Sequence, residues 1–282
     1  MSATLLHHRI WQRRTLPGFG PTLGLTLTYL GVIVVIPLAA LTVKAAGIGP
    51  RAFLAILAEP RTLAAFRVSF GLSLAAAGLN AGIGLLLAWV LSRYRFPGRR
   101  LADALIDLPF ALPTAVAGIT LATLYSDNGW LGALLAPLGI EVSFTRLGIF
   151  VALVFIGLPF VVRAVQPLVA DLDRNEEEAA RTLGASDTAI FWRVVLPALL
   201  PGILTGTALA FARGVGEYGS VIFIAGNMPG VSEIAPLLIV TKLEQYDYAG
   251  AAAIATVMLA VSFVILIALN GIEHWSRRRH GG

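Results

Sequence analysis

The feature that most constrains this chain is a series of long apolar runs that carry no charge. A helix needs about 20 apolar residues to cross the ~30 Å hydrocarbon layer of a bilayer. Six runs reach or approach this length, and each predicts a membrane-spanning helix, at about 20–43, 68–92, 108–126, 147–165, 194–213 and 248–272. We therefore expect an all-α membrane protein with six transmembrane helices that forms a single membrane domain over residues 1–282.

The composition favours a membrane protein over the other classes that a basic chain suggests. Hydrophobic residues make up 57% of the sequence and charged residues only 13%, whereas roughly a quarter of the residues in soluble domains are charged. The net charge of +5 comes from basic residues that cluster in short segments between the apolar runs. This pattern indicates membrane topology rather than a nucleic-acid-binding face. The absence of cysteine excludes disulfides, thiolate metal sites and cysteine nucleophiles.

The distribution of Lys and Arg predicts the orientation in the membrane. With six spans, 14 of the 21 basic residues fall on the side of the two termini and 7 on the other side. Because basic residues concentrate in cytoplasmic loops, we expect cytoplasmic N- and C-termini and a cytoplasmic segment at 171–197. Four of the opposing residues lie between Lys44 and Arg67 and run against this trend. The first run is longer than the apolar part of a signal peptide, so we expect an uncleaved helix.

Residues that could support catalysis or bind a cofactor do not occur in suitable arrangements. Neither of the two lysines follows a glycine, so the chain has no G-x-x-x-x-G-K-[ST] loop to hold ATP. All four histidines lie in the polar ends, where a metal pair at His7 and His8 is only a minor alternative. Ser69 and Ser73 have no base nearby in sequence and are expected to pack between helices. We therefore expect no enzyme activity, no metal and no cofactor in this chain.

The most charged stretch, 171–197, lies between the fourth and fifth apolar runs. The glutamates at 176–178 suit the start of a short helix, because carboxylates stabilise the positive end of the helix dipole. Glu177 can pair with Arg181 one turn later. A different face of the same helix carries small and apolar residues: Ala179, Ala180 and Leu183.

The second half of this stretch predicts another helix. Gly184 suits a left-handed position after the first helix, and Ser186 suits the N-cap of the next. Pro197 marks the start of the fifth span, and the apolar residues before it are Ile190, Phe191, Val194 and Val195. We expect a helix–turn–helix on the cytoplasmic surface. It is either a solvated loop or a docking surface on which the small alanines let a partner approach closely.

The spacing in 171–197 resembles the EAA loop of ABC-importer permeases. That signature reads EAA-x3-G-x9-I-x-LP, and this chain has the same residues at the same spacing except for valine in place of isoleucine. In that family the loop is a coupling helix that sits in a cleft of the ATPase subunit. The resemblance implies that ATPase coupling depends on Glu178, Ala179, Ala180, Gly184, Val194, Leu196 and Pro197, and that ATP and Mg are bound by the partner subunits.

Two further stretches, 93–122 and 213–230, are similar to the permeases of sulfate/thiosulfate importers. This narrower resemblance implies a type I ABC-importer transmembrane domain with its core at about 64–272. It also implies import of sulfate or thiosulfate across the bacterial inner membrane. The implied partners are a homologous second permease (CysW-like), two ATP-binding subunits (CysA-like) and a periplasmic sulfate/thiosulfate-binding protein, with no nucleic acid.

Three alternatives stay open. Molybdate permeases are similar in the first of these stretches, so a homodimeric molybdate or tungstate permease is the main one. A self-sufficient secondary transporter would be expected to show inverted repeats and ionisable residues in mid-span, and we find neither. A membrane scaffold without transport activity is the third.

Charged residues beside the apolar runs are candidates for the anion pathway, because charge inside a membrane is costly and marks function by default. Arg213 and Glu217 follow the fifth run at helical spacing, among three glycines. They fit either a site that attracts a passing anion or an ion pair whose two charges neutralise each other. The uncharged stretch at 218–232 is too short to span, and we expect it to be re-entrant or interfacial.

The start of the third run contains the candidate gate. Pro109 and Pro113 suit a kinked gate helix, or they simply mark where the helix begins. Thr114 offers a hydroxyl to an oxyanion, although hydroxyls in spans usually bond to their own backbone. Asp103 and Asp107 lie one turn apart at the cytoplasmic mouth of this run.

Overall fold

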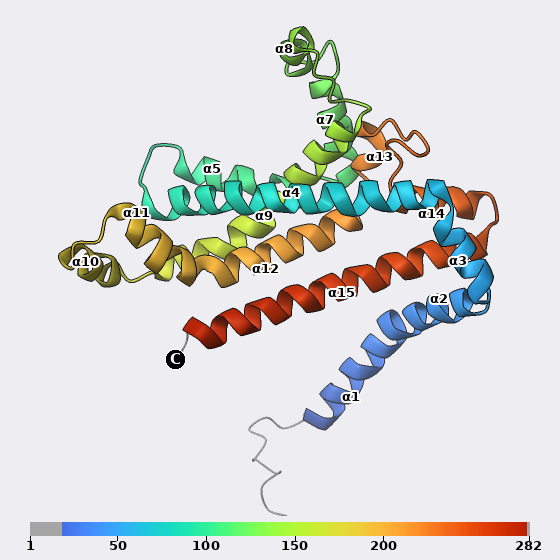
Figure 1. The fold of residues 1–282 in the computed structure, drawn as a ribbon, viewed down its shortest axis with the longest axis horizontal. Helices are drawn as coiled ribbons and strands as arrows, with labels where there is room; N and C mark the ends of the chain where they lie inside the picture. Colours follow the sequence, from blue (N-terminus) through green and yellow to red (C-terminus); the bar gives the residue numbers. More distant parts are fainter. Residues whose placement is uncertain (1–18, 281–282) are drawn as a thin grey trace, which may run out of the picture.

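The computed structural model describes residues 19–280 of the chain, together with the side chains of 19–268 and 271. Every regular element in this range is a helix, which confirms the all-α prediction. Four long helices form the body of the molecule (Figure 1): α4 (Pro60–Arg93), α9 (Arg146–Asp171), α12 (Leu196–Val215) and α15 (Tyr248–His280). The basic residues near both ends, such as Arg9 and Arg277, lie outside the described side chains, so the cytoplasmic position of the termini stays a prediction.

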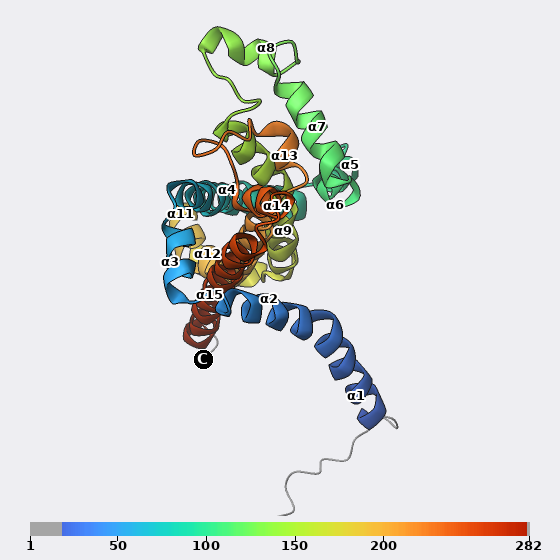
Figure 2. The same cartoon turned by 90° about the vertical axis from the view of Figure 1, so that its right-hand side faces the viewer.

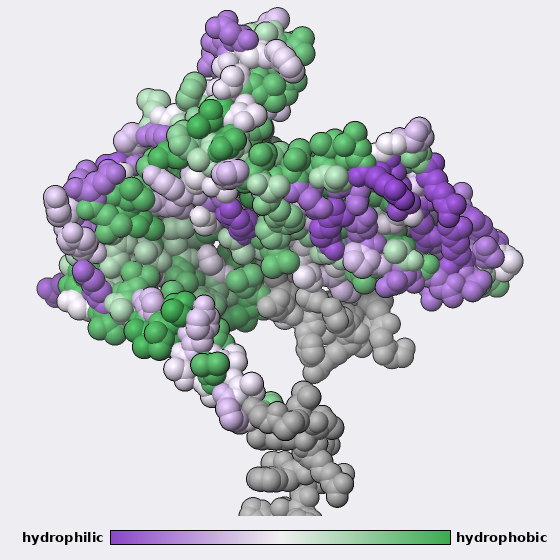
Figure 3. Space-filling view, turned by 180° about the vertical axis from the view of Figure 1, so that it is seen from behind, coloured by the Kyte–Doolittle hydropathy of each residue, from purple (hydrophilic) through white to green (hydrophobic). Residues whose placement is uncertain are grey.

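Shorter helices surround this body. They are α1 (Phe19–Leu30), α2 (Ile36–Ala46), α3 (Pro50–Ala58), α5 (Arg99–Ile106), α6 (Leu108–Ala111), α7 (Thr114–Tyr125), α8 (Gly132–Leu135), α10 (Arg174–Thr182), α11 (Asp187–Ile190), α13 (Val221–Ile224) and α14 (Ala235–Glu244). Helices α10 and α11 lie at one end of the body, and α3 and α14 lie at the other (Figure 1). Helix α1 and the α7–α8 arm project away from the body in different directions (Figure 2). Polar side chains gather at the α10–α11 end, whereas apolar side chains cover much of the middle (Figure 3).

Glycines allow the long helices to approach closely. A Cβ added to Gly84 of α4 would lie 2.7 Å from the side chain of Val161 in α9, and one added to Gly206 of α12 would lie 2.6 Å from the Cα of Val161. Within a membrane, helices associate through van der Waals packing rather than through a hydrophobic driving force. These glycines therefore set the spacing between α4, α9 and α12.

Two prolines inside continuous helices follow π-helical turns. The π-helix η3 (Phe191–Val195) precedes Pro197, and η1 (Gly31–Val35) precedes Pro37. Proline lacks an N–H and its ring clashes with the carbonyl four residues earlier, so the wider turn relieves both problems. As a result α11, η3 and α12 run as one helix. The second helix of the 171–197 segment therefore continues directly into the fifth apolar run.

Five helices in the described part are long and apolar enough to cross a membrane, and they cover 19–46, 60–93, 146–171, 187–215 and 248–268. The third run differs from the prediction, because the helix expected at 108–126 is divided into α6 and the 12-residue α7. Leu112 is extended with ψ 135°, since the ring of Pro113 excludes the helical conformation from the residue before it. The third run therefore bends at Pro113, and α7 leaves the direction of the body (Figure 2).

The stretch at 218–232 forms the one-turn helix α13, which packs on α7 and α9, followed by a loop. The guanidinium of Arg61 donates two hydrogen bonds of 2.7 Å to Glu233, and the guanidinium of Arg146 donates to the Val231 carbonyl. These long-range bonds fix the loop against α4 and α9. Its expected re-entrant or interfacial depth stays a prediction.

Candidate functional site

The segment at 171–197 folds as two capped helices. The Asp173 carboxylate accepts a hydrogen bond of 2.9 Å from the Asn175 N–H at the start of α10. Gly184 has φ +83°, a conformation that glycine adopts without the penalty of a Cβ. The Ser186 hydroxyl accepts from the Ala189 N–H at 3.3 Å and caps α11. The predicted helix–turn–helix, its left-handed glycine and its serine cap are confirmed.

The ion pairs of this segment differ from the prediction. Glu177 pairs with Arg93 at the end of α4, and Arg181 pairs with Asp187 across the turn, at 3.0 Å. The expected pair between Glu177 and Arg181 is therefore wrong. Folding brings Arg93 to Glu177 from another part of the chain, and the Gly184 turn places Asp187 beside Arg181.

The seven motif residues separate into two groups. Glu178, Ala179 and Gly184 are exposed on α10 and its turn, while Ala180 turns inward against the hydrophobic core. Leu183, beside them, is 88% exposed. The other three motif residues belong to the continuous helix that enters the body: Val194, Leu196 and Pro197. The α10 face and its turn thus form an outward surface, and the rest of the motif anchors it.

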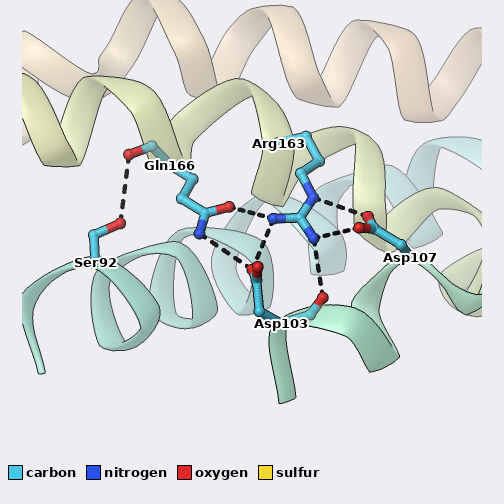
Figure 4. Close-up of polar contacts among 5 residues, drawn as sticks. All are labelled: Ser92, Asp103, Asp107, Arg163 and Gln166. Carbon is cyan, nitrogen blue, oxygen red and sulfur yellow. Dashed lines mark hydrogen bonds and ion pairs between the residues drawn. The ribbon is translucent and has the colours of Figure 1, made fainter. Parts of the chain in front are cut away.

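A network around Arg163 joins α9 to α5 and α6 (Figure 4). The guanidinium donates to Asp107 at 2.8 and 2.6 Å, to the Asp103 carboxylate at 2.7 Å and to the Asp103 carbonyl at 2.9 Å. The Gln166 side chain accepts a hydrogen bond from Arg163 and donates one to Asp103 at 3.2 Å. The Ser92 hydroxyl of α4 donates to the backbone carbonyl of Gln166 at 3.4 Å. The sequence places the two aspartates one turn apart, but their spacing does not connect them to Arg163. The sequence signal that could have pointed to this network is Arg163 itself, a single arginine within the fourth apolar run.

This network shifts the titration of one carboxylate. The hydrogen bond from the Arg163 guanidinium lowers the pKa of Asp103 from its ordinary value of 3.8, against the opposing effect of partial burial. The aspartate therefore stays charged at neutral pH. This charge attaches α5, which precedes the third run, to α9 at the end of the molecule that carries α10.

Arg213 and Glu217 form an ion pair at the other end of α12. The Glu217 side chain is only 2% exposed, whereas that of Arg213 is 36% exposed. Glu217 also accepts hydrogen bonds from the backbone N–H and the hydroxyl of Ser220, at 2.8 and 2.9 Å. The charge of Glu217 is therefore neutralised by Arg213, and the Glu217 carboxylate also holds the turn that follows it. The Arg213 side chain stays partly exposed.

Helix α7 packs on this turn, so several candidates of the anion pathway meet here. A Cβ at Gly219 would lie 2.2 Å from the Thr114 hydroxyl oxygen, and a Cβ at Gly118 would lie 2.3 Å from the Ser220 carbonyl oxygen. Pro113 immediately precedes Thr114, whereas Pro109 lies one short helix earlier in α6, which packs on α9. The structure thus places Pro113 and Thr114 beside the turn that Glu217 organises and leaves Pro109 apart.

No group of acidic or histidine side chains in the described part of the chain is arranged to hold a metal ion. The histidines of the two ends lie outside the described side chains.

Known proteins resemble this chain over most of its length. Residues 80–279 match the family described as "Binding-protein-dependent transport system inner membrane component". The chain belongs to this family. The "Sulfate transport system permease protein CysT" of Synechococcus elongatus is 54% identical to this chain. The match covers 91% of this chain and 92% of the Synechococcus protein. The protein of the same name from Escherichia coli is 47% identical over 95% of this chain and 96% of its own.

Solved structures of ABC transporters contain chains with the same fold. A chain of a bacterial alginate ABC transporter, in complex with a periplasmic protein bound to an alginate pentasaccharide, superposes with a TM-score of 0.74 at 18% identity, over 92% of this chain and 93% of that one. A chain of the MetNI methionine ABC transporter, in an inward-facing conformation, superposes with a TM-score of 0.55 at 17% identity, over 74% of this chain and 93% of that one. This chain therefore has the helical fold of an ABC-transporter membrane domain.

Proposed function

We propose that this chain is one permease half of an ATP-driven importer that carries sulfate or thiosulfate across the bacterial inner membrane. The observation that supports sulfate or thiosulfate as the substrate is the 54% identity, over 91% of the chain, to a protein named for sulfate transport. The similarity covers 256 residues of the chain. The chain itself catalyses no reaction, and ATP with Mg is bound by the partner ATPase subunits.

The surface formed by α10 and the Gly184 turn is the proposed contact with the ATPase. Its exposed glutamate and alanine lie beside Leu183, an apolar side chain that a protein partner would cover. The small side chain of Ala179 lets the partner's surface come near the α10 backbone. Val194, Leu196 and Pro197 would transmit movement of this surface, because they lie in the helix that continues from α11 into the body.

Helix α12 connects the proposed coupling surface to the proposed anion pathway. Its 20 residues span about 30 Å, and the pair of Arg213 and Glu217 lies at its far end. Movement of the coupling surface would reach Arg213, Thr114 and the Ser220 turn through this single helix. The partly open guanidinium would offer positive potential to a passing dianion, and the α6–α7 bend at Pro113 would form part of the gate.

The proposed assembly contains a second, homologous permease (CysW-like), two ATP-binding subunits (CysA-like) and a periplasmic sulfate/thiosulfate-binding protein. Its N- and C-termini and the 171–197 segment face the cytoplasm. Supporting this arrangement, the structural relatives are chains of ABC transporters, one of them with a periplasmic protein bound.

The test is uptake by the complete importer in proteoliposomes, with radiolabelled sulfate, thiosulfate and molybdate offered separately. We expect ATP-dependent uptake of sulfate or thiosulfate only when the ATPase and the binding protein are both present. Preferential uptake of molybdate would replace the proposal with the molybdate permease. Uptake driven by an ion gradient without the ATPase would replace it with a secondary transporter.

A further inference from the structure

Three arginines surround a hollow at the turn between α4 and α5. Arg95, Arg99 and Arg100 line a space of about 360 Å³ together with Phe96 and Gly98. Stretch 94–102 contains no acidic residue. Among the described side chains, none of the three arginines forms an ion pair with a carboxylate. Arg99 is close enough to lower the pKa of Asp103, but the carboxylate of Asp103 is bound by Arg163. The hollow therefore has three positive charges without a bound counter-charge.

The backbone of this turn keeps the arginines in place. Gly98 has φ +84°, which reverses the chain, and the Arg99 N–H donates to the Phe96 carbonyl at 3.3 Å. The neighbouring Arg93 does not contribute, because Glu177 already neutralises it. Guanidinium groups bind phosphate-type oxyanions through paired N–H donors.

Apolar side chains next to the hollow are exposed. Tyr94 is 57% and Phe96 38% exposed, and on α5 Leu101 is 65% and Leu105 52% exposed. The opposite face of α5 carries Asp103, which is bound to α9. A helix with one apolar face and basic residues at its end is typical of helices that lie in the membrane surface, where aromatic residues also gather. A soluble anion gains nothing from these leucines, whereas a lipid meets both the charges and the acyl-chain surface.

We propose that the α4–α5 turn binds a phosphate-class oxyanion at the cytoplasmic membrane surface, presented as the headgroup of an acidic phospholipid. The three arginines contact the phosphate, while Leu101 and Leu105 lie against the acyl chains. This site is separate from the proposed transport pathway and does not depend on which anion is imported. Because Asp103 and Asp107 tie the same segment to Arg163, a bound lipid also steadies the attachment of α5 and α6 to α9.

Lipid binding is measured on the purified importer in nanodiscs made of phosphatidylcholine alone or mixed with phosphatidylglycerol, with bound lipid quantified by native mass spectrometry after release. The test variant carries Arg95→Gln, Arg99→Gln and Arg100→Gln together. We expect its preference for phosphatidylglycerol to fall by about fivefold per arginine removed at low salt, and less at high salt. The control, Arg51→Gln with Arg67→Gln, removes exposed charges outside this turn and should leave the preference unchanged.

A second variant separates the two sources of the anion. Leu101→Gln with Leu105→Gln should lower phosphatidylglycerol binding but not the displacement of that lipid by inorganic phosphate. If inorganic phosphate binds and the leucine variant has no effect on lipid, the site belongs to a free anion and the lipid assignment is overturned. Equal lipid preference in the triple arginine variant and the parent overturns the site altogether. A single Arg100→Gln variant gives a smaller change in the same direction if the triple variant does not assemble. None of these readouts requires transport, so they are independent of the proposed function.

Discussion

Arg93, the last residue of α4, is ion-paired with Glu177 of α10 at 2.5 Å, although 84 positions separate them in the chain. Both side chains are largely buried, at 13% and 17% exposure. The Arg93 guanidinium also lies over the ring of Trp89, at 5.0 Å, and Trp89 meets Phe191 edge-on. The start of α10 is thus tied to the end of α4 by a charge pair with an aromatic support.

Glu177→Gln should loosen α10 while leaving the body folded. Loss of a hydrogen-bonded charge at a largely buried site costs about 2 kcal/mol, so we expect faster hydrogen–deuterium exchange in α10, by about 30-fold. If α10 couples to the ATPase, substrate-stimulated ATP hydrolysis should fall in the same variant. Arg181→Gln is the control, because its pair with Asp187 is solvent-exposed and such pairs contribute little. Equal exchange in both variants would show that the Arg93 contact does not hold α10.

Gly184→Val should uncouple or detach the ATPase from an inserted permease. No atom lies within 4 Å of the added Cβ, so the effect comes from the left-handed backbone, at about 1–2 kcal/mol. Gly184→Asn should be milder, since asparagine tolerates this conformation. Glu178→Lys should have the same functional effect through charge alone. Co-purification of the ATPase and substrate-stimulated ATP turnover are the measurements.

The control for Gly184 is Gly139→Val, which imposes similar strain at φ +69° in the turn after α8. It should leave ATPase binding intact. Normal co-purification and normal stimulation in both Gly184→Val and Glu178→Lys would contradict the coupling role of this surface.

Arg213→Ala should lower anion uptake without lowering assembly of the importer. The variant leaves the buried Glu217 without its counter-charge, and it removes the partly open guanidinium from the proposed pathway. Arg213→Lys keeps the charge and should retain part of the uptake. Initial uptake rates, normalised to the amount of assembled complex, give the comparison. Unchanged uptake in the alanine variant would leave the pair with a purely structural role.

Gly118→Ala should destabilise the contact between α7 and the Ser220 turn. The new Cβ would meet the Ser220 carbonyl oxygen at 2.3 Å and its Cα at 2.7 Å, so backbone atoms must shift. Such overpacking costs about 1–3 kcal/mol and should lower the thermal unfolding temperature of the purified protein. Gly78→Ala in α4 is the control, because no atom lies within 4 Å of its added Cβ. A Gly118 variant as stable as this control would show that α7 can move without cost.

The contribution of Asp103 to stability should depend on pH in the acid range. Arg163 lowers the pKa of Asp103 in the folded protein below the ordinary 3.8, so the unfolded chain takes up the proton first as pH falls. The stabilisation is therefore complete above this value and is lost as pH falls through the lower, folded pKa. The stability difference between the parent and Asp103→Asn, measured by thermal unfolding, should be constant near neutral pH and shrink in acid. A difference that grows in acid would contradict the pairing with Arg163.

The sequence predicted those features that depend on local chemistry. Apolar runs located the long helices, because a helix in a membrane satisfies its own backbone and needs only length and hydropathy. Gly184 and Ser186 located the turn and cap of the α10–α11 segment, since both act on residues only a few positions away. The division of the third run also had a local cause in Pro113, but proline inside an apolar run fits either a kink or a helix start.

Contacts between distant segments were decided by the tertiary structure alone. Sequence spacing favoured Glu177 with Arg181, yet packing brought Arg93 to Glu177 and the turn brought Asp187 to Arg181. The link from Arg163 to Asp103 likewise joins two helices, and the close approach of Thr114 and Gly219 joins α7 to the turn after α12. Helical periodicity states which face a side chain occupies, but not which helix lies opposite. That choice follows from how glycines such as Gly84 and Gly206 let α4, α9 and α12 pack, and it emerges only when the helices assemble.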